Sequence, residues 1–304
     1  IMMKKLCSSD NIYSFLLYIS GIFLILIVIL IFIDLIISSI PSIKAFNLSF
    51  LVKSIWDPVR NEFGALPFII GTLLTSFLAV IISTPLSIGS AILLDEYVSS
   101  RISNMLSSLI ELLAAIPSVV YGLWGIFVLV PAMRSLEKFL YAHFSFIPFF
   151  NSEPYGVGVL TAIVILCIMI IPYSLSIIRE VLKLVPKDQK EAGYALGATK
   201  WEVISKIKIP YIRSGIFAGI GLSLGRALGE TMAVTMVIGN RNATPKTLFD
   251  PANTLASVIA NEFTEATSSL HISSLIELGL ILFIITFITN FIMRLILRKV
   301  SIKR

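Results

Sequence analysis

The stretch PYGVGVLTAIVILCIMIIPYSLSII, residues 154–178, contains no Asp, Glu, Lys or Arg. A helix needs about 20 apolar residues to cross the hydrocarbon core of a bilayer, so this stretch is long enough to span one. Three more uncharged blocks and two apolar stretches with a few charges are present, at residues 12–33, 63–94, 112–133, 211–240 and 272–293. The sequence therefore predicts an all-α, polytopic membrane protein with six transmembrane helices.

The composition agrees with a single transmembrane domain over residues 1–304. Hydrophobic residues make up 57% of the chain and charged residues 14%, whereas soluble domains carry about 25% charged residues. The first apolar block is longer than the core of a signal peptide, so we expect it to be a retained span. The spans are expected at about residues 12–35, 66–94, 108–131, 156–178, 211–240 and 272–294.

The net charge of +6 does not indicate a nucleic-acid partner. If both termini lie in the cytoplasm, most Lys and Arg residues fall in four cytoplasmic segments, 1–11, 95–105, 179–213 and 294–304. An excess of basic residues on the cytoplasmic side is typical of membrane proteins. We therefore expect a multi-pass protein of the bacterial cytoplasmic (inner) membrane, with membrane lipid as its surroundings.

The sequence offers no signature of enzymatic chemistry. It contains no phosphate-binding loop, no His-Glu-x-x-His pattern and no metal-spaced group of His and Cys. Cys7 is expected in the cytoplasm and Cys167 in the middle of the membrane, so the two cannot form a disulfide. His143 and His271 are expected in outer segments without a special role. The chain is thus expected to hold no metal or cofactor, and any ATP must be hydrolysed by another chain.

The segment between the fourth and fifth spans is the largest predicted cytoplasmic feature. It reads EAGYALGATKWE over residues 191–202 and continues to Ile207 and Pro210. Its small residues favour a short helix of low profile, and Gly197 suits a left-handed turn that ends this helix. Pro210 suits the first turn of the next span. We expect this segment to dock on a partner.

This segment, residues 188–210, resembles the EAA loop of ABC importer permeases, which reads Glu-Ala-Ala-x3-Gly-x9-Ile-x-Leu-Pro. Gly193 stands in place of the second Ala and Ile209 in place of the Leu. The glycine is expected to weaken the helix by up to about 1 kcal/mol. The resemblance implies that the loop couples the permease to its ATPase through Glu191, Ala192, Gly193, Gly197, Ile207 and Pro210.

The fifth predicted span contains GRALGET at residues 225–231. A charge near the bilayer centre costs roughly 2.5–3.5 kcal/mol on insertion scales, so Arg226 and Glu230 point to a function. Their i,i+4 spacing predicts an ion pair on one helical face, which Ser223 extends. A guanidinium matches the oxygens of phosphate, and we expect the anion to compete with Glu230 for Arg226. The alternative is a neutralised structural bridge.

Two other features concern the spans. Gly221, Gly225 and Gly229 repeat every four residues, a spacing that lets two spanning helices approach closely. Asp95 and Glu96 lie at the end of the second predicted span, where carboxylates reach water, and are expected to be boundary residues. The sequence thus predicts one helix-packing stripe and one buried charge pair on the fifth span.

The fifth span carries a more specific likeness. The run GRALGETMAVTMVIGN, residues 225–240, is similar to the fifth-span signature of the PstC-type permeases of ABC phosphate importers, and AAIPSVVYG, residues 114–122, resembles their third span. The sister PstA-type permeases share the Pro-Ser-x-x-Tyr-Gly element and a Gly-Glu-Thr step but differ afterwards. The resemblance implies a type I ABC importer permease fold.

The same resemblance implies a heteromeric phosphate importer. Its other parts would be a PstA-like permease, two ATP-binding subunits that hold ATP and Mg²⁺, and an outer phosphate-binding protein. Two alternatives stay open at this point. One is a permease for another oxyanion such as sulfate or molybdate, and the other is an ATP-independent channel or ion-coupled carrier.

Overall fold

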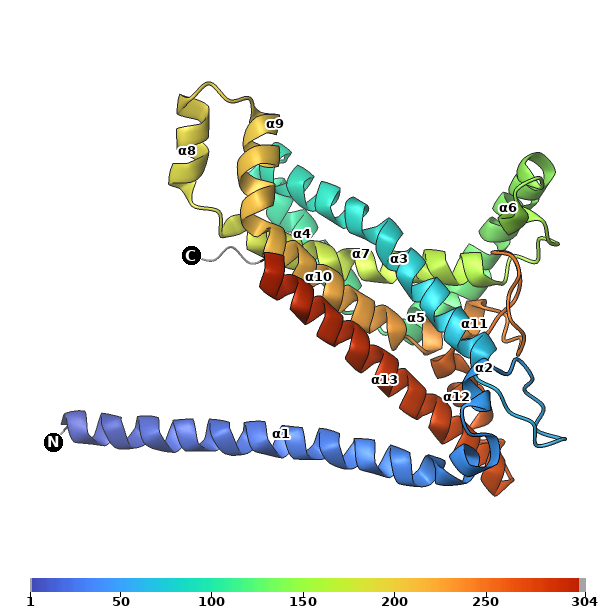
Figure 1. Ribbon diagram of the computed structural model, residues 1–304. Coiled ribbons are helices and arrows are strands. Elements are labelled where there is room, and N and C mark those ends of the chain that lie inside the picture. Colours follow the sequence, from blue (N-terminus) through green and yellow to red (C-terminus); the bar gives the residue numbers. More distant parts are fainter. Residues whose placement is uncertain (1, 301–304) are drawn as a thin grey trace.

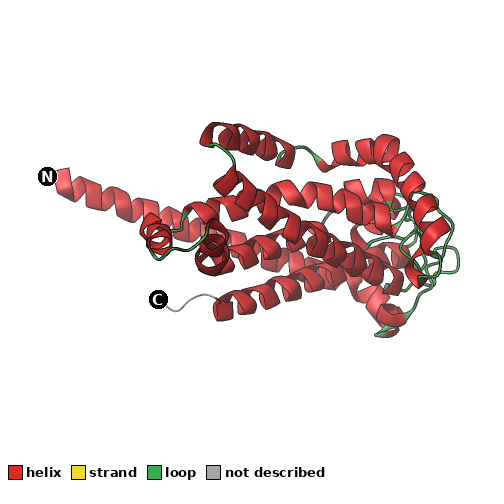
Figure 2. Ribbon diagram, turned by 90° about the horizontal axis from the view of Figure 1, so that it is seen from above, coloured by secondary structure: helices red, strands yellow, loops and turns green. Residues whose placement is uncertain are grey.

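The computed structural model describes residues 2–300, with side chains from Tyr13 to Lys299. Every named element in this range is helical (Figure 2). The helices are α1 (Met2–Phe46), α2 (Ser49–Val52), α3 (Leu66–Ile92), α4 (Ser100–Ala114), α5 (Ser118–Trp124), α6 (Val130–Phe144), α7 (Val159–Lys183), α8 (Lys187–Ala195), α9 (Lys200–Val203), α10 (Ile209–Leu228), α11 (Met232–Val237), α12 (Leu255–Glu262) and α13 (Ser269–Val300). The side chains of Cys7 and of several basic residues used in the charge analysis lie outside the described part: Lys4, Lys5, Lys303 and Arg304.

The predicted all-α membrane fold is confirmed. Within the described residues, five helical stretches are long and apolar enough to cross a membrane: Tyr13–Phe46, Leu66–Tyr97, Ser118–Phe144, Val159–Lys183 and Ser269–Lys299. The helix α10 completes the bundle but is not among these five. The stretch over residues 211–240, predicted as one span, is divided between α10 and α11.

The third span also differs from the prediction. We expected it over residues 108–131, but helix α4 ends at Ala114 and the apolar helical stretch runs over Ser118–Phe144. The break falls just before Pro117, which lacks an N–H group and disfavours the helical conformation in the residue before it. The segment that follows the expected third span is therefore largely helix α6, which projects from the bundle (Figure 1).

Two prolines in long helices follow π-helical turns. One turn covers Gly125–Leu129 and precedes Pro131, and the other covers Ile204–Lys208 and precedes Pro210. A proline ring in a regular α-helix clashes with the carbonyl group four residues earlier. In both places that carbonyl lies in the π-helical turn, where the wider backbone gives the ring room.

The core of the bundle is formed around α7, with α3 and α10 packed against it (Figure 1). Its buried side chains include Ala79 of α3, Leu166 of α7 and Leu228 of α10. The hydroxyl groups of Ser87 and Ser174 hydrogen-bond across the α3–α7 interface at 2.6 Å. In a membrane, close packing and hydrogen bonds between helices hold a bundle together, because lipid tails are as apolar as the side chains.

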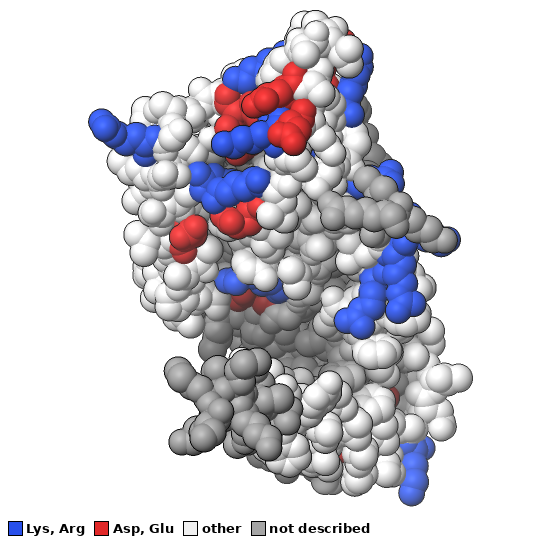
Figure 3. Space-filling view, turned by 90° about the vertical axis from the view of Figure 1, so that its left-hand side faces the viewer, with Lys and Arg blue, Asp and Glu red and all other residues white. Residues whose placement is uncertain are grey.

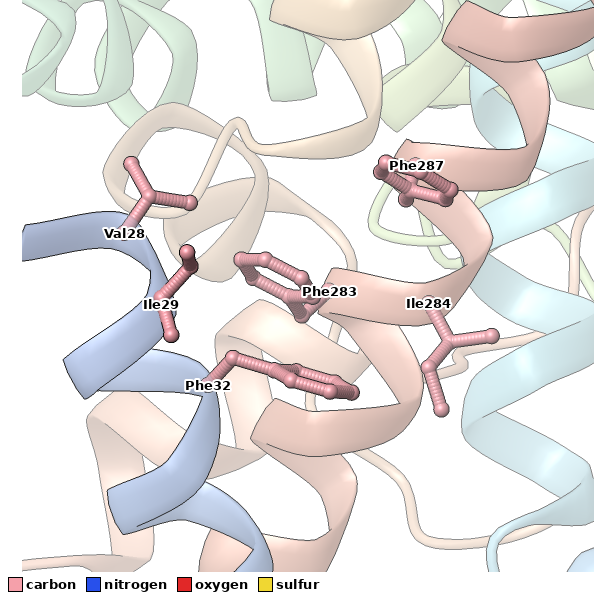
Figure 4. A pocket seen from close by; sticks show the side chains of 6 residues that line it. All are labelled: Val28, Ile29, Phe32, Phe283, Ile284 and Phe287. Atoms are coloured by element: carbon pink, nitrogen blue, oxygen red, sulfur yellow. The ribbon is translucent and has the colours of Figure 1, made fainter. Parts of the chain in front are cut away.

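The helix α1 stands apart from the bundle along most of its length (Figure 1). Its side chains from Tyr13 to Ile31 are exposed, and its packing is almost entirely against α13. An apolar groove of about 340 Å³ lies between α1 and α13, lined only by Val28, Ile29, Phe32, Phe283, Ile284 and Phe287 (Figure 4). The rings of Phe32 and Phe283 stack with their centroids 5.2 Å apart.

A hydroxyl group of α13 enters the backbone ladder of α1. Ser273 donates to the carbonyl oxygen of Ser38 at 3.0 Å and accepts from the N–H of Ser42 at 3.0 Å. Pro41 lies beside this point and has no N–H to donate. A side chain inserted in this way is a recognised cause of helix bending, and here it satisfies backbone groups that α1 leaves open.

The end of the bundle opposite α8 contains a polar network that the sequence analysis did not foresee. His271 is buried, and its Nε2 lies 3.1 Å from Oε2 of Glu262. The indole of Trp56 donates to the same oxygen at 2.8 Å, and the amide of Asn242 donates to Oε1 at 2.8 Å. Glu262 of α12 thus contacts three separate segments: the loop before α3, the loop before α12, and α13. His143, in contrast, is exposed on α6.

Candidate functional site

The segment α8–α9 forms one end of the molecule, where α1 also begins and α13 ends (Figure 1). Figure 3 views this end, and both Lys or Arg and Asp or Glu side chains gather on its upper part, where α8 and α9 lie. The remainder of the same face carries fewer acidic side chains. The predicted docking segment is therefore a projection that carries charges of both signs.

The backbone of this segment follows the prediction. Gly197 has φ +84° and ends α8 in a left-handed turn. The N–H of Ala198 donates to the carbonyl of Gly193 at 3.1 Å, and the N–H of Gly197 donates to that of Tyr194 at 2.9 Å. These two bonds form a Schellman motif. Pro210 occupies the first turn of α10, as expected.

The helix α9 begins with a capping box. The Thr199 hydroxyl accepts from the N–H of Glu202, and the Glu202 carboxylate accepts from the N–H of Thr199. This backbone hydrogen bond and the nearby Lys206 ammonium lower the pKa of Glu202 to about 2. The start of α9 is therefore locally fixed even though it is exposed.

The glycine that departs from the EAA pattern has a packing reason. Glu191 and Ala192 are exposed on α8, whereas Gly193 is buried. A Cβ atom on Gly193 would lie 2.6 Å from Cδ1 of Ile207 and 3.2 Å from a methyl group of Val203. The helix α8 thus lies directly on the helical segment that follows it, while its other face presents Glu191 and Ala192 outward.

The prediction for Asp95 and Glu96 is wrong. Both carboxylates contact the ammonium group of Lys208, and their side chains are only 18% and 15% exposed. They are covered because α3 continues through a π-helical turn, Leu93–Tyr97, which reaches under α9 and α10. Two adjacent carboxylates at the end of an apolar span, together with a lysine two residues before Pro210, were the sequence signal for this cluster.

The predicted ion pair between Arg226 and Glu230 is not formed. The i,i+4 geometry requires a continuous helix, but α10 ends at Leu228 and Gly229 is its C-terminal cap. Glu230 instead accepts a hydrogen bond from the N–H of Ala233 at 3.3 Å, at the start of α11. A carboxylate at a helix N-terminus is favourable, so Glu230 fixes the second helix rather than the cation of the first.

Arg226 is half-buried and lacks a polar partner in the described part of the chain. Its Nε is buried without a hydrogen-bond partner, and the guanidinium carbon lies 5.4 Å from the ring centroid of Tyr173. The hydroxyl oxygen of Ser223, one turn earlier on α10, is also buried without a partner. The two predicted site residues therefore lie one turn apart on α10, and each has a buried polar atom without a hydrogen-bond partner in the described residues.

The glycine stripe only partly meets its prediction. A Cβ atom on Gly221 would lie 3.3 Å from Met293, and one on Gly225 would lie 3.7 Å from the amide of Asn290, so both glycines face α13. Gly229 does not pack a helix, because α10 has already ended there. The contacts at Gly221 and Gly225 are with side chains rather than with the backbone of the neighbouring helix.

Asn290 was missed by the sequence analysis. It lies within α13, against the turn of α10 that carries Arg226, and its side chain is exposed. No hydrogen bond reaches its amide from the described residues. A carboxamide within an apolar span is costly unless it meets a polar partner, and this cost was the available signal.

The arrangement of helices is that of the membrane domains of solved ABC importers. A chain of the crystal structure of a bacterial alginate ABC transporter, in complex with an alginate pentasaccharide-bound periplasmic protein, matches with a TM-score of 0.63 at 15% identity, over 97% of this chain and 98% of that chain. A chain of the inward-facing MetNI methionine ABC transporter matches with a TM-score of 0.56 at 16% identity, over 84% of this chain and 97% of that chain. The fold is therefore that of a type I ABC importer permease.

Relatives in sequence narrow this class. Residues 83–302 match the family described as "Binding-protein-dependent transport system inner membrane component". The phosphate transport system permease protein PstC of Haemophilus influenzae is 44% identical over 84% of this chain and 82% of that protein, and PstC of Pasteurella multocida is 45% identical over 87% and 84%. The probable PstC of Methanocaldococcus jannaschii is 37% identical over 82% and 81%. The chain belongs to the family of binding-protein-dependent transport system inner membrane components.

Proposed function

We propose that this chain is the membrane permease subunit of an ATP-powered phosphate importer and forms half of its translocation pathway. The relatives from Haemophilus influenzae and Pasteurella multocida, each matching more than four fifths of the chain, are phosphate permeases by name. The role of a membrane permease follows from the family. The substrate, the site and the partners are the proposed part.

The observation that carries the anion role is the unpaired cation of Arg226. A guanidinium stays charged when it is desolvated, and a buried donor without a partner costs about 1–3 kcal/mol. An oxyanion that accepts from Arg226 removes this cost. The sequence suggested that the anion would have to displace the Glu230 carboxylate from Arg226. Because Glu230 is held at the start of α11, no such displacement is needed.

The remaining polar groups near Arg226 complete a small site. The Ser223 hydroxyl is a second donor on the same helix, and its oxygen has no partner in the described structure. Tyr173 packs its ring against the guanidinium and limits where this group can move. Arg226 supplies charge, Ser223 supplies a neutral donor, and Glu230 fixes the backbone that follows the helix break.

Exposed surfaces of the chain support the proposed partners. The face of α8 that carries Glu191 and Ala192 is free in this chain and suits a groove on one of two ATP-binding subunits, which would bind ATP and Mg²⁺. The long apolar flank of α1 suits a PstA-like permease and lipid. An outer phosphate-binding protein would deliver the anion at the end opposite α8.

We place the chain in the bacterial cytoplasmic membrane with the α8–α9 end inside. The start of α1 and the end of α13 lie at that same end (Figure 1), so both termini are cytoplasmic in this orientation. The basic residues of 179–213 then lie on the side where membrane proteins carry their positive charge.

Substitution of Arg226 tests the anion role. We expect Arg226→Ala to lower phosphate uptake by about tenfold to a hundredfold, since a charge-assisted hydrogen bond is worth about 1.5–3 kcal/mol. Arg226→Lys should keep part of the activity, because a lysine retains the charge but not the planar fork. The measurement is uptake of labelled phosphate in cells, with assembly checked by purification of the complex.

The control is Arg60→Ala, which removes an exposed arginine outside the bundle. Normal phosphate uptake by both Arg226 variants, in complexes that assemble normally, would contradict the proposal. Competition with sulfate and molybdate in the same assay separates a phosphate permease from one for another oxyanion. Uptake without the ATP-binding subunits would indicate a channel or carrier instead.

A further inference from the structure

The most deeply buried basic residue in the described structure is Lys208. Its side chain is 0% exposed, although it is only two residues from the exposed Pro210 and adjoins the cytoplasmic end of the bundle. Its ammonium group lies 2.6 Å from Oδ2 of Asp95 and also contacts Oε1 of Glu96. Burial alone would lower the pKa of Lys208, but the hydrogen bonds with the two carboxylates outweigh it and raise the pKa. Lys208 is therefore a fixed positive charge.

The three residues join segments that are far apart in the chain. Asp95 and Glu96 lie in the π-helical turn Leu93–Tyr97, which continues α3, whereas Lys208 ends the π-helical turn that leads into α10. More than 100 residues separate the two turns. We call Lys208, Asp95 and Glu96 the Lys208 clamp. It is a polar link between the second span and the loop that carries α8.

Further contacts join α8 and α9 to the end of α3. Lys200 at the start of α9 donates to the main-chain oxygen of Glu96, and its ammonium lies 4.3 Å from the ring centroid of Tyr97. Lys190 of α8 approaches the clamp closely enough that burial and the Lys208 ammonium lower its pKa. Helices α8 and α9 thus both contribute to the contact with the end of α3.

The exposed helix α8 packs directly against the segment that carries Lys208. Gly193 lies against Ile207, with a distance of 2.6 Å between a Cβ position on the glycine and the isoleucine Cδ1, and Lys208 is the next residue. Beneath Lys208, the side chains of Ile204 and Ile212 pack with Ile92 and Ile178 in one apolar cluster. A displacement of α8 must therefore also displace the end of α3.

From this geometry we infer that the Lys208 clamp is a positioning device that makes α8 and the second span, α3, move as one body. Lys208 is a positioning residue, because it contacts neither the anion nor the ATPase. A force on α8 reaches α3 directly through the clamp, and α3 packs along α7 and α10, the helix that carries Arg226. The inference rests on the proposed role as an ATP-driven permease.

The first test replaces the charges without leaving one unpaired. Removal of Lys208 alone would strand two buried carboxylates, whereas a buried ion cluster replaced as a whole by neutral groups of similar shape is often tolerated. We therefore combine Lys208→Met, Asp95→Asn and Glu96→Gln, in the transporter purified with its partner subunits and reconstituted in vesicles. The readout is phosphate imported per ATP hydrolysed. We expect this ratio to fall at least fivefold, with ATP hydrolysis within twofold of the unaltered transporter.

The matched control is Lys206→Met, which removes an exposed lysine from the same π-helical turn and should leave the ratio unchanged. A normal ratio in the triple variant overturns the inference. The unaltered transporter serves as the reference for the proposed function, since failure of that transporter to import phosphate with ATP would remove the function itself and not only the clamp.

A second test does not depend on the folding of the triple variant. Cysteines at Lys200 and Tyr97, in a chain with Cys7→Ser, are joined by a short bifunctional reagent, which locks α9 to the end of α3. If the two move as one body, the cross-linked transporter imports phosphate at the rate of the same variant before cross-linking. Loss of import on cross-linking, regained when the link is cleaved, would overturn the inference.

Discussion

Two cations at opposite ends of α10 have opposite surroundings. Lys208 is fully buried and contacts two carboxylates, whereas Arg226 is half-buried and its Nε has no hydrogen-bond partner in the described chain. Both lie on the same continuous helical path, one just before α10 and the other near its end. A folded chain normally pairs its buried charges, because a charge that loses water must gain other partners.

The difference separates a structural cation, Lys208, from the cation that we propose to bind the anion, Arg226. The partners of Lys208 come from the chain itself, so its charge holds the fold. Arg226 has no hydrogen-bond partner among the described residues, and we propose that its charge binds a ligand that comes and goes. An unsatisfied polar group in a native structure calls for such an explanation. The comparison yields predictions about stability as well as transport.

The largest difference should appear when each cation is removed. We expect Lys208→Ala to destabilise the chain by about 3–5 kcal/mol, since it leaves two carboxylates buried without their partner. Arg226→Ala should change stability by less than about 1 kcal/mol, because no partner loses a bond. Detergent-titrated unfolding of the purified protein measures both. Equal losses for the two variants would abolish the distinction.

A neutral polar contact gives a middle point on the same scale. Ser273→Ala removes the hydroxyl that joins Ser38 and Ser42 of α1, and leaves a backbone carbonyl and an N–H open. We expect a loss of about 1–2 kcal/mol in the same unfolding measurement. Ser20→Ala is the control, because the Ser20 hydroxyl bonds only within its own helix. A loss no larger than that of the control would show that the inserted hydroxyl is dispensable.

The smallest effect is expected at Ser223. Its buried hydroxyl has no partner among the described residues, so Ser223→Ala removes an unsatisfied group and should leave stability unchanged or raise it by less than about 1 kcal/mol. Phosphate uptake should nevertheless require a concentration a few-fold higher for half-maximal rate. A clear loss of stability in this variant would place Ser223 with the structural groups, beside Lys208.

Local features of this fold were predictable from the sequence. Uncharged blocks gave the helical membrane class, because only helices and closed barrels satisfy the backbone in lipid. Gly197 and Pro210 were interpretable because the turn after a helix and the first turn of the next depend on one residue each. The docking segment could therefore be located to within a few residues.

Features that depend on distant or competing partners were not predictable. The i,i+4 pairing of Arg226 with Glu230 assumed a continuous helix, but a cap at Gly229 and a hydrogen bond from Ala233 gave the backbone and the carboxylate a better alternative. Asp95 and Glu96 were read as boundary residues because Lys208, their partner, lies more than 100 positions later. Sequence spacing alone carries no information on such contacts.

The junction of α1 and α13 has a consequence for biosynthesis. The helix α1 leaves the ribosome early, yet its principal contact, including the Ser273 hydroxyl in its ladder, lies 231 residues later in the chain. Until α13 has been inserted, the polar backbone around Pro41 has no internal partner, and α1 must wait in lipid or beside another protein. Closure of the bundle is therefore a late step, and truncation before α13 should leave the first span unanchored.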